Sequence, residues 1–303
     1  MSVIEKALDK VRRSAISGQP NVPETGLAPA MPGGAGRAQP ATGVTTLEVA
    51  PASPARRITV SWQSLQDAGY VPEAGLERQF AGQYRQIKRR LIETAMSAGS
   101  GAPSMRAIVA TSALPGDGKT FTSINLAFSI ARERDLNVLL IDADVASPRI
   151  SDVFGQKDSP GLLDALQDPS LDIESLVLGT DVPGLSLLPA GKWAENATEM
   201  LSSARMDRIV ARLTANPRRI VLFDSPPLLV STEAQVLLKN AGQVVLVARA
   251  GKTPRRAIVD AIGHIGEEKS VGLVLNQAQG TQATDYYGYG TYGSQNGEPD
   301  DSR

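Results

Sequence analysis

Pro115-Gly116-Asp117-Gly118-Lys119-Thr120 is the stretch that decides the fold of this chain. An apolar run, 107–110, precedes it, and a helical pattern begins near the lysine, so the context is strand, loop and helix, as a phosphate-binding loop requires. Backbone N–H groups of such a loop wrap phosphates at the helix N-terminus. The lysine reaches the β- and γ-phosphates, and the threonine hydroxyl is placed on Mg²⁺. The pattern predicts an ATP and Mg²⁺ site whose binding residues are Pro115, Gly116, Asp117, Gly118, Lys119, Thr120 and Phe121.

The fold class follows from apolar runs that alternate with helical stretches. These runs are Ala107–Ala110, Val138–Ile141, Ile220–Phe223, Val244–Ala248 and Leu273–Leu275. Near-continuous apolar strands are typical of a parallel sheet that helices cover on both faces. We therefore expect an α/β protein of the P-loop NTPase type, with a doubly wound, mostly parallel sheet flanked by helices.

Polar side chains follow these strands, at the edge where ligands bind in doubly wound sheets. They are Thr111, Ser112, Asp142, Asp224, Arg249 and Asn276. We expect Asn276 to contact adenine and Arg249 a phosphate or a neighbouring subunit, although either residue could equally be a structural strand end.

The C-terminal segment combines tyrosines with residues that could not build a core. Tyr286, Tyr287, Tyr289 and Tyr292 lie within seven residues, among glycine, serine and glutamine. One interpretation is a disordered or self-associating low-complexity tail. The other is that the chain is a kinase carrying its own substrate, with these four tyrosines as the phosphorylation sites.

Three strand-end aspartates supply the remaining chemistry. Asp142 and Asp144 are two residues apart and so lie on the same side of an extended segment. Isolated strand-end aspartates are usually caps or turn formers, but three beside a phosphate-binding loop indicate Mg²⁺ binding and proton transfer. We expect Asp142 to accept the tyrosine proton, while Thr120, Asp144 and Asp224 hold Mg²⁺. Lys119, Asp142, Asp144 and Asp224 are the predicted catalytic residues.

Composition excludes several other classes of protein. The 303 residues carry a net charge of −1, no cysteine and a single histidine, His264. Cysteine-ligated metal sites, disulfide scaffolds and histidine-based triads are therefore excluded or disfavoured. No broad basic field points to nucleic acid. The chain has no apolar run of membrane-spanning length and no signal-peptide pattern, so we expect a cytoplasmic protein.

The sequence predicts five segments. Residues 1–17 form an amphipathic helix, and residues 18–57 form a disordered linker with seven prolines, six glycines and eight alanines. Residues 58–104 form a helical flank, 105–280 the catalytic domain and 281–303 the tyrosine-rich tail. The helix of the flank carries a basic face for oligomerisation or an acidic partner. Its cations are Arg78, Arg85, Lys88, Arg89 and Arg90.

The combined motifs resemble the bacterial tyrosine kinases (BY-kinases). The resemblance rests on the phosphate-binding loop followed by Asn125-Leu126-Ala127, on Asp142-Ala143-Asp144 with Pro148, on Asp224-Ser225-Pro226-Pro227 and on the tyrosine cluster. The segments 188–191 and 199–206 look like those that separate the family's two acidic motifs. The start, 1–7, and the segment 84–89 look like the exosortase-associated (PEP-CTERM locus) tyrosine autokinases.

This resemblance implies a protein-tyrosine kinase that autophosphorylates its tail with ATP, between the subunits of a ring-shaped homo-oligomer. It further implies a membrane-anchored polysaccharide chain-length regulator as activator, a cognate tyrosine phosphatase, and peripheral association with the inner membrane through the partner. The implied role is in exopolysaccharide synthesis, chain length and export.

The chain departs from the expected motifs at several positions. Ala113 stands where the usual loop begins with glycine, and Ala146 where many family members have arginine. The family's oligomerisation helix reads Glu-x-x-Arg-x-x-Arg, whereas this chain has Gly82, Arg85 and Lys88.

The main alternative is a nucleotide-switched ATPase scaffold of the partitioning or cell-division type, without kinase activity. Such proteins place a signature lysine four residues before the Gly-Lys pair, where this chain has Leu114. In a further alternative, the tail serves only for assembly. Neither alternative would put phosphate on tyrosine.

Overall fold

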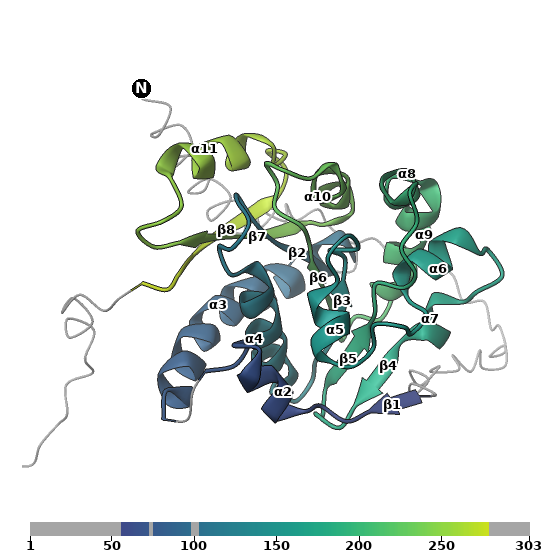
Figure 1. Cartoon of the computed structure of the whole chain (residues 1–303), viewed down its shortest axis with the longest axis horizontal. Coiled ribbons are helices and arrows are strands. Elements are labelled where there is room, and N and C mark those ends of the chain that lie inside the picture. The colour runs from purple at the N-terminus through teal and green to yellow at the C-terminus, as the bar shows by residue number, and fades with distance from the viewer. Residues whose placement is uncertain (1–55, 73–74, 98–102, 279–303) are drawn as a thin grey trace, which may run out of the picture.

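Eight strands form one sheet at the centre of the molecule, in the order β1-β4-β5-β3-β6-β2-β7-β8 (Figure 1). The computed structural model describes residues 56–72, 75–97 and 103–278. The predicted helix at 1–17, all but the last two residues of the predicted linker, and the tyrosine cluster lie outside these residues. All paired strands are parallel except β4 and β5, which confirms the mostly parallel sheet predicted from the sequence.

The strands are β1 (Arg56–Ile58), β2 (Ala107–Ser112), β3 (Asn137–Asp142), β4 (Leu178–Thr180), β5 (Leu185–Leu188), β6 (Arg219–Asp224), β7 (Gln243–Arg249) and β8 (Ser270–Asn276). The helices are α2 (Trp62–Asp67), α3 (Glu77–Ser97), α4 (Lys119–Ala131), α5 (Arg149–Val153), α6 (Leu162–Gln167), α7 (Ile173–Leu176), α8 (Ala197–Leu201), α9 (Ala204–Leu213), α10 (Thr232–Leu237) and α11 (Arg255–Gly263). Short 3₁₀ turns, η1 (Pro103–Arg106) and η2 (Leu238–Asn240), precede β2 and β7.

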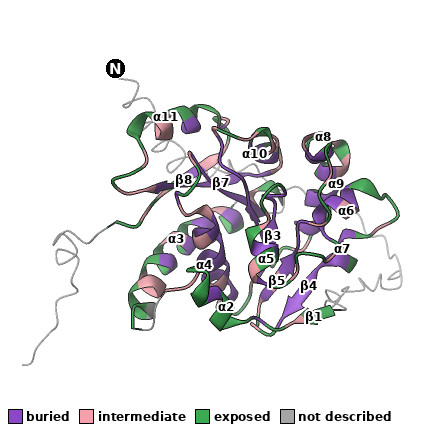
Figure 2. Cartoon of the chain, in the orientation of Figure 1, coloured by how far each residue is buried: buried purple, intermediate pink, exposed green. Residues whose placement is uncertain are grey.

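The central strands are buried on both faces (Figure 2). In β2, Ala107 and Val109 pack with α6 to α11, whereas Ile108 and Ala110 pack on the opposite face with α2 to α5. Successive side chains of a strand point to opposite faces, so an apolar run with little alternation supplies two cores at once. This is the doubly wound arrangement predicted from the sequence.

Three strands are not predicted by the sequence pattern. β1 begins at Arg56, two residues inside the predicted linker, and pairs with β4, which in turn runs antiparallel to β5. β1 and β4 have only three residues each and β5 has four. Runs this short carry no periodic signal, and their strand conformation comes from pairing at the edge of the sheet rather than from local propensity.

The basic face of α3 differs in part from the prediction. Lys88 is buried, donates from Nζ to the carbonyl oxygen of Ser129 on α4 at 2.9 Å and pairs with Glu133 at 2.6 Å. Arg89 pairs with Glu93 one turn later on the same helix. Lys88 therefore joins α3 to α4. Arg78, Arg85 and Arg90 are exposed cations of α3 that form no ion pair with the described residues.

None of the helices in the described part of the chain has the length and apolar character needed to span a membrane.

The contacts of Lys88 predict a stability difference between two cations of α3. In Lys88→Ala, the Ser129 carbonyl loses a charge-assisted hydrogen bond in a buried position, which should lower the free energy of unfolding by about 2 kcal/mol. Arg85→Ala, at an exposed position of the same helix, should change it by less than about 0.5 kcal/mol. Urea unfolding at pH 7 measures both, and equal losses would contradict the structural role of Lys88.

Candidate active site

The phosphate-binding loop joins the end of β2 to the start of α4 and depends on two glycines with positive φ. Gly116 has φ +83° and Gly118 has φ +95°, conformations that favour glycine. A Cβ at Gly118 would also overlap the side-chain amide of Asn276, at the end of β8. Ala113, at the position of the usual first glycine, is fully buried in the core, so this departure leaves the turn itself intact.

The carboxylate of Asp117 stabilises the conformation of the loop by accepting hydrogen bonds. Its Oδ2 accepts a hydrogen bond from the backbone N–H of Leu114 at 3.1 Å, and its Oδ1 accepts one from the hydroxyl of Thr253 at 2.6 Å. Asn276 donates from Nδ2 to the carbonyl oxygen of Asp117 at 3.0 Å. The carboxylate of Asp117 is thus occupied within the protein, and the loop is tied to the ends of β7 and β8.

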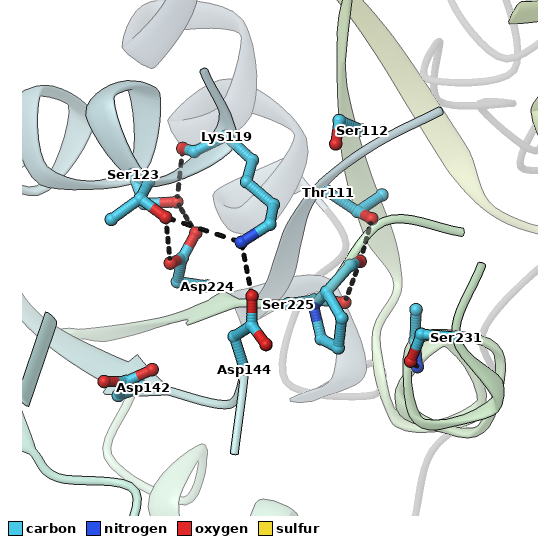
Figure 3. A network of polar contacts seen from close by, with 12 residues as sticks. Thr111, Ser112, Lys119, Ser123, Asp142, Asp144, Asp224, Ser225 and Ser231 are labelled. Atoms are coloured by element: carbon cyan, nitrogen blue, oxygen red, sulfur yellow. Dashed lines mark hydrogen bonds and ion pairs between the residues drawn. The ribbon is translucent and has the colours of Figure 1, made fainter. Parts of the chain in front are cut away.

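Two predicted site residues at the start of α4, the catalytic Lys119 and the metal-binding Thr120, meet two of the strand-end aspartates (Figure 3). Lys119 Nζ lies 2.6 Å from Asp144 Oδ2. The hydroxyl of Thr120 donates to Asp224 at 2.7 Å, and that of Ser123 donates to the other oxygen of the same carboxylate at 2.8 Å. Lys119 Nζ also lies 3.5 Å from the hydroxyl oxygen of Thr120, so lysine, threonine and the two carboxylates form one connected cluster.

Asp142 lies in direct register with Asp224 on the neighbouring strand, but its contacts are separate. Its Oδ2 accepts from the backbone N–H and the hydroxyl of Ser151, at 2.7 and 2.8 Å. Its Oδ1 is buried and has no hydrogen-bond partner among the described residues. Burial, followed by the negative charge of Asp224, raises the pKa of Asp142 to about 7.

The pKa values of Asp224 and Lys119 are also set by burial and by neighbouring charges. Burial raises the pKa of Asp224, although Lys119 and the hydroxyls of Thr120 and Ser123 oppose this effect. Burial by itself would lower the pKa of Lys119, but the carboxylates of Asp224, Asp144 and Asp142 raise it above its usual value. The lysine therefore stays protonated and available to bind phosphate.

The donor set fits Mg²⁺ bound together with a nucleotide. The hydroxyl of Thr120 and the carboxylates of Asp144 and Asp224 are hard oxygen ligands of the kind Mg²⁺ takes. Within the described ranges, no group of three or more His, Cys, Asp or Glu residues is arranged to hold a metal by itself. Mg²⁺ bound here would complete its shell with phosphate oxygens and water, as is usual for this ion.

The remaining predicted binding residues differ in what they can offer. Pro115 is exposed at the tip of the loop. The ring of Phe121 packs edge-on against Phe80 of α3, with ring centroids 5.9 Å apart, so its contribution to a phosphate site would come from its backbone N–H. The four tyrosines of the tail lie outside the described residues.

Sequence reasoning missed several residues of the site. Ser123 lies four residues after Lys119, so helical spacing could have placed it on the same face of α4. Ser151 and Thr253 come from loops and helix starts that carry no such signal. Tyr70, whose pKa is raised chiefly by burial, lies within electrostatic range of Arg149, Asp224 and Lys119; nothing in its local sequence indicates this position.

Comparison with known proteins agrees with this geometry. Residues 108–285 match the family model described as the CobQ/CobB/MinD/ParA nucleotide binding domain. The tyrosine-protein kinase YwqD of Bacillus subtilis is 33% identical over 204 residues, which cover 67% of this chain and 85% of YwqD. The putative tyrosine-protein kinase EpsB of Ralstonia nicotianae is 35% identical over 61% of this chain, but the match spans only 24% of EpsB.

Among solved structures, the tyrosine kinase domain of BceF is similar with a TM-score of 0.55 and 26% identity. The match covers 74% of this chain and 92% of the BceF domain.

The raised pKa of Asp142 predicts a pH dependence of stability. Between about pH 4 and pH 7 the folded protein keeps a proton on Asp142 that the unfolded chain has released, so stability falls as pH rises through this window. Asp142→Asn lacks this proton uptake. In EDTA without nucleotide, the free energy of unfolding of the variant relative to wild type should therefore increase by about 1–3 kcal/mol from pH 5 to pH 8.

Denaturant unfolding across this pH range measures the difference. Asp158→Asn, at an exposed position, is the matched control and should follow the wild-type profile. Parallel profiles for wild type and Asp142→Asn would show that Asp142 does not carry the shift.

Proposed function

Because the chain belongs to the bacterial tyrosine kinase family, within the CobQ/CobB/MinD/ParA nucleotide-binding class, we propose that it uses ATP and Mg²⁺ to phosphorylate tyrosines of its own C-terminal cluster. The observation that carries this proposal is the cluster of Lys119, Thr120, Asp144 and Asp224 at the carboxyl edge of the sheet. β8, which leads into the tail, ends at the same edge.

Each residue of the cluster has a different proposed role in phosphoryl transfer. Lys119 would exchange Asp144 for the β- and γ-phosphates, and the backbone N–H groups of residues 116–121 would hold the phosphate oxygens. Thr120, Asp144 and Asp224 would hold Mg²⁺, which when bound neutralises charge on the transferred phosphoryl group. Asp144, once released by the lysine, would be free to act as a ligand of the metal.

Asp142 is the proposed acceptor of the tyrosine proton. The tyrosyl oxygen attacks the γ-phosphorus, the bond from that phosphorus to the oxygen of ADP breaks, and the phenolic proton leaves. A pKa of about 7 suits a base that works near neutral pH. Because Asp142 is fully buried, we propose that its unpartnered Oδ1 receives the proton through one bridging water.

The tail can reach an active site in either of two ways. Ten residues separate Asn276 from Tyr286, a span of at most roughly 33–36 Å when extended. This length allows transfer within one chain as well as to a neighbour. Our preference for transfer between subunits of a homo-oligomer, with a ring as its form, rests on the family resemblance.

The proposed kinase would be regulated by partners at the membrane. We propose a membrane-anchored chain-length regulator as activator, a cognate tyrosine phosphatase, and a cytoplasmic kinase held at the inner membrane by its partner. The process served would be exopolysaccharide synthesis, chain length and export. The exposed cations of α3, Arg78, Arg85 and Arg90, offer a surface for an acidic partner or subunit. Membership of the exosortase-associated subgroup remains a prediction from the sequence.

Incubation of the purified protein with ATP and Mg²⁺ tests this function. Mass spectrometry should find phosphotyrosine at Tyr286, Tyr287, Tyr289 or Tyr292. Lys119→Met, which removes the charge that stabilises the transferring phosphoryl group, should lower the yield at least a hundredfold.

A variant with all four tail tyrosines changed to phenylalanine should incorporate no phosphate in the tail. Absence of phosphotyrosine from wild type, even with a candidate membrane activator present, would favour the nucleotide-switched scaffold.

A further inference from the structure

A basic turn lies beside the root of the tail and is not used by the proposed mechanism. It comprises residues 249–256, which join β7 to α11, and carries Arg249, Lys252, Arg255 and Arg256. Figure 1 shows β7, β8 and α11 together at one end of the molecule. The four cations occur within eight residues of a chain whose overall net charge is −1.

The backbone of this turn is fixed by its own hydrogen bonds. The N–H of Arg249 donates to the hydroxyl of Thr253 at 2.7 Å, and the N–H groups of Lys252 and Thr253 donate to the carbonyl oxygen of Arg249 at 3.2 and 3.0 Å. Thr253 in turn donates to Asp117 of the phosphate-binding loop. The four cations are therefore attached to a backbone whose conformation is fixed by hydrogen bonds.

These cations are largely unneutralised. Lys252, Arg255 and Arg256 are exposed. Among the described residues, the one ion pair of the turn joins Arg256 to Asp260 at 3.8 Å, with the arginine side chain 93% exposed. Across the described ranges, no carboxylate lies within ion-pair distance of Arg249, Lys252 or Arg255. The turn thus offers positive charge to a ligand from outside the described structure.

The root of the tail lies against this turn. Arg249 is in register with Asn276, and the N–H of Ala250 donates to the carbonyl oxygen of Asn276 at 2.9 Å. Tyr286 follows ten residues later, so the tyrosine cluster is tethered to the cations. Such a tether gives an effective concentration in the millimolar range, at which even a weak site is occupied.

Phosphorylation would change the charge of the tail and so the site to which it binds. Each phosphate adds about −1.5 to −2 charges at pH 7 and three acceptor oxygens that arginine can bind in a bidentate manner. The active site contains three carboxylates and one lysine, so it repels a phosphorylated tail more than an unphosphorylated one. The basic turn is the complementary surface at the same edge of the sheet.

We propose that Arg249, Lys252, Arg255 and Arg256 form a phosphotyrosine-binding site that captures the phosphorylated tail of the same chain. This site rests on the proposed function, since it takes the product of that reaction as its ligand. Capture removes the product tail from the active site. The hydroxyl of Thr253 links this turn to Asp117 of the nucleotide loop by one hydrogen bond.

A peptide-binding experiment tests the site without requiring kinase activity. The probe is a fluorescein-labelled synthetic peptide of residues 283–295, with phosphotyrosine at the four tyrosine positions or with none. The host is the full chain with its four tail tyrosines changed to phenylalanine. Fluorescence anisotropy, measured with and without ADP and Mg²⁺, should show at least tenfold tighter binding of the phosphorylated peptide.

Two charge-matched triple variants of this host locate the binding. Lys252→Gln with Arg255→Gln and Arg256→Gln should weaken binding of the phosphorylated peptide at least tenfold. Arg208→Gln with Arg212→Gln and Arg218→Gln removes three exposed cations near α9 and the start of β6 and should leave binding within twofold. Equal effects of the two variants, or displacement of the peptide by ADP, would overturn the proposal.

Failure of this site and failure of the proposed function are distinguishable. The peptide is phosphorylated chemically, so its binding is independent of catalysis. A kinase without this site would yield phosphotyrosine in the ATP assay but no selective peptide binding.

Discussion

The ammonium group of Lys119 is the charge on which the site depends. Its Nζ lies 2.6 Å from Asp144 Oδ2. The negative charges of Asp224 and Asp142 also stabilise its protonated form and compensate for the water that burial removes. Two of these carboxylates are fully buried, and a buried charge without a partner is expensive. The position of Lys119 at the first turn of α4 therefore decides whether two neighbouring strand ends, those of β3 and β6, can carry three acids side by side.

The sheet determines where that lysine can be. Parallel strands β3, β6 and β2 lie next to one another, with Asp142 paired in register to Asp224 and Asp224 to Ala110. The chain leaves β2 two residues after Ala110, and the loop must return as a helix over the same edge. Gly116 and Gly118 allow this return with positive φ, and the packing of α4 against the sheet fixes its first turn.

Much of this could be predicted from the sequence. The five apolar runs predicted strands β2, β3, β6, β7 and β8. The residues that follow these runs predicted the positions of Asp142, Asp224 and Asn276, because strand ends of a parallel sheet meet at one edge. The short strands β1, β4 and β5 could not be predicted, since their conformation comes from pairing. Lys88 was predicted on a basic face for oligomerisation or an acidic partner. Helical spacing shows which residues share a face, but not that Ser129 and Glu133 lie opposite Lys88.

The different surroundings of Asp142 and Asp144 could not be predicted from the sequence and are seen only in the structure. By sequence, Asp142 and Asp144 differ only in position, yet one is bound by Ser151 and the other by Lys119. In the proposed function, this division would separate proton acceptance from phosphate and metal binding. The negative charges of Asp224 and Asp144 add to the effect of burial in raising the pKa of Asp142. A divalent cation held by Asp144 and Asp224 would offset those charges and lower that pKa. Binding of Mg²⁺ with the nucleotide would thus prepare Asp142 as a base in the same step that assembles the phosphate site.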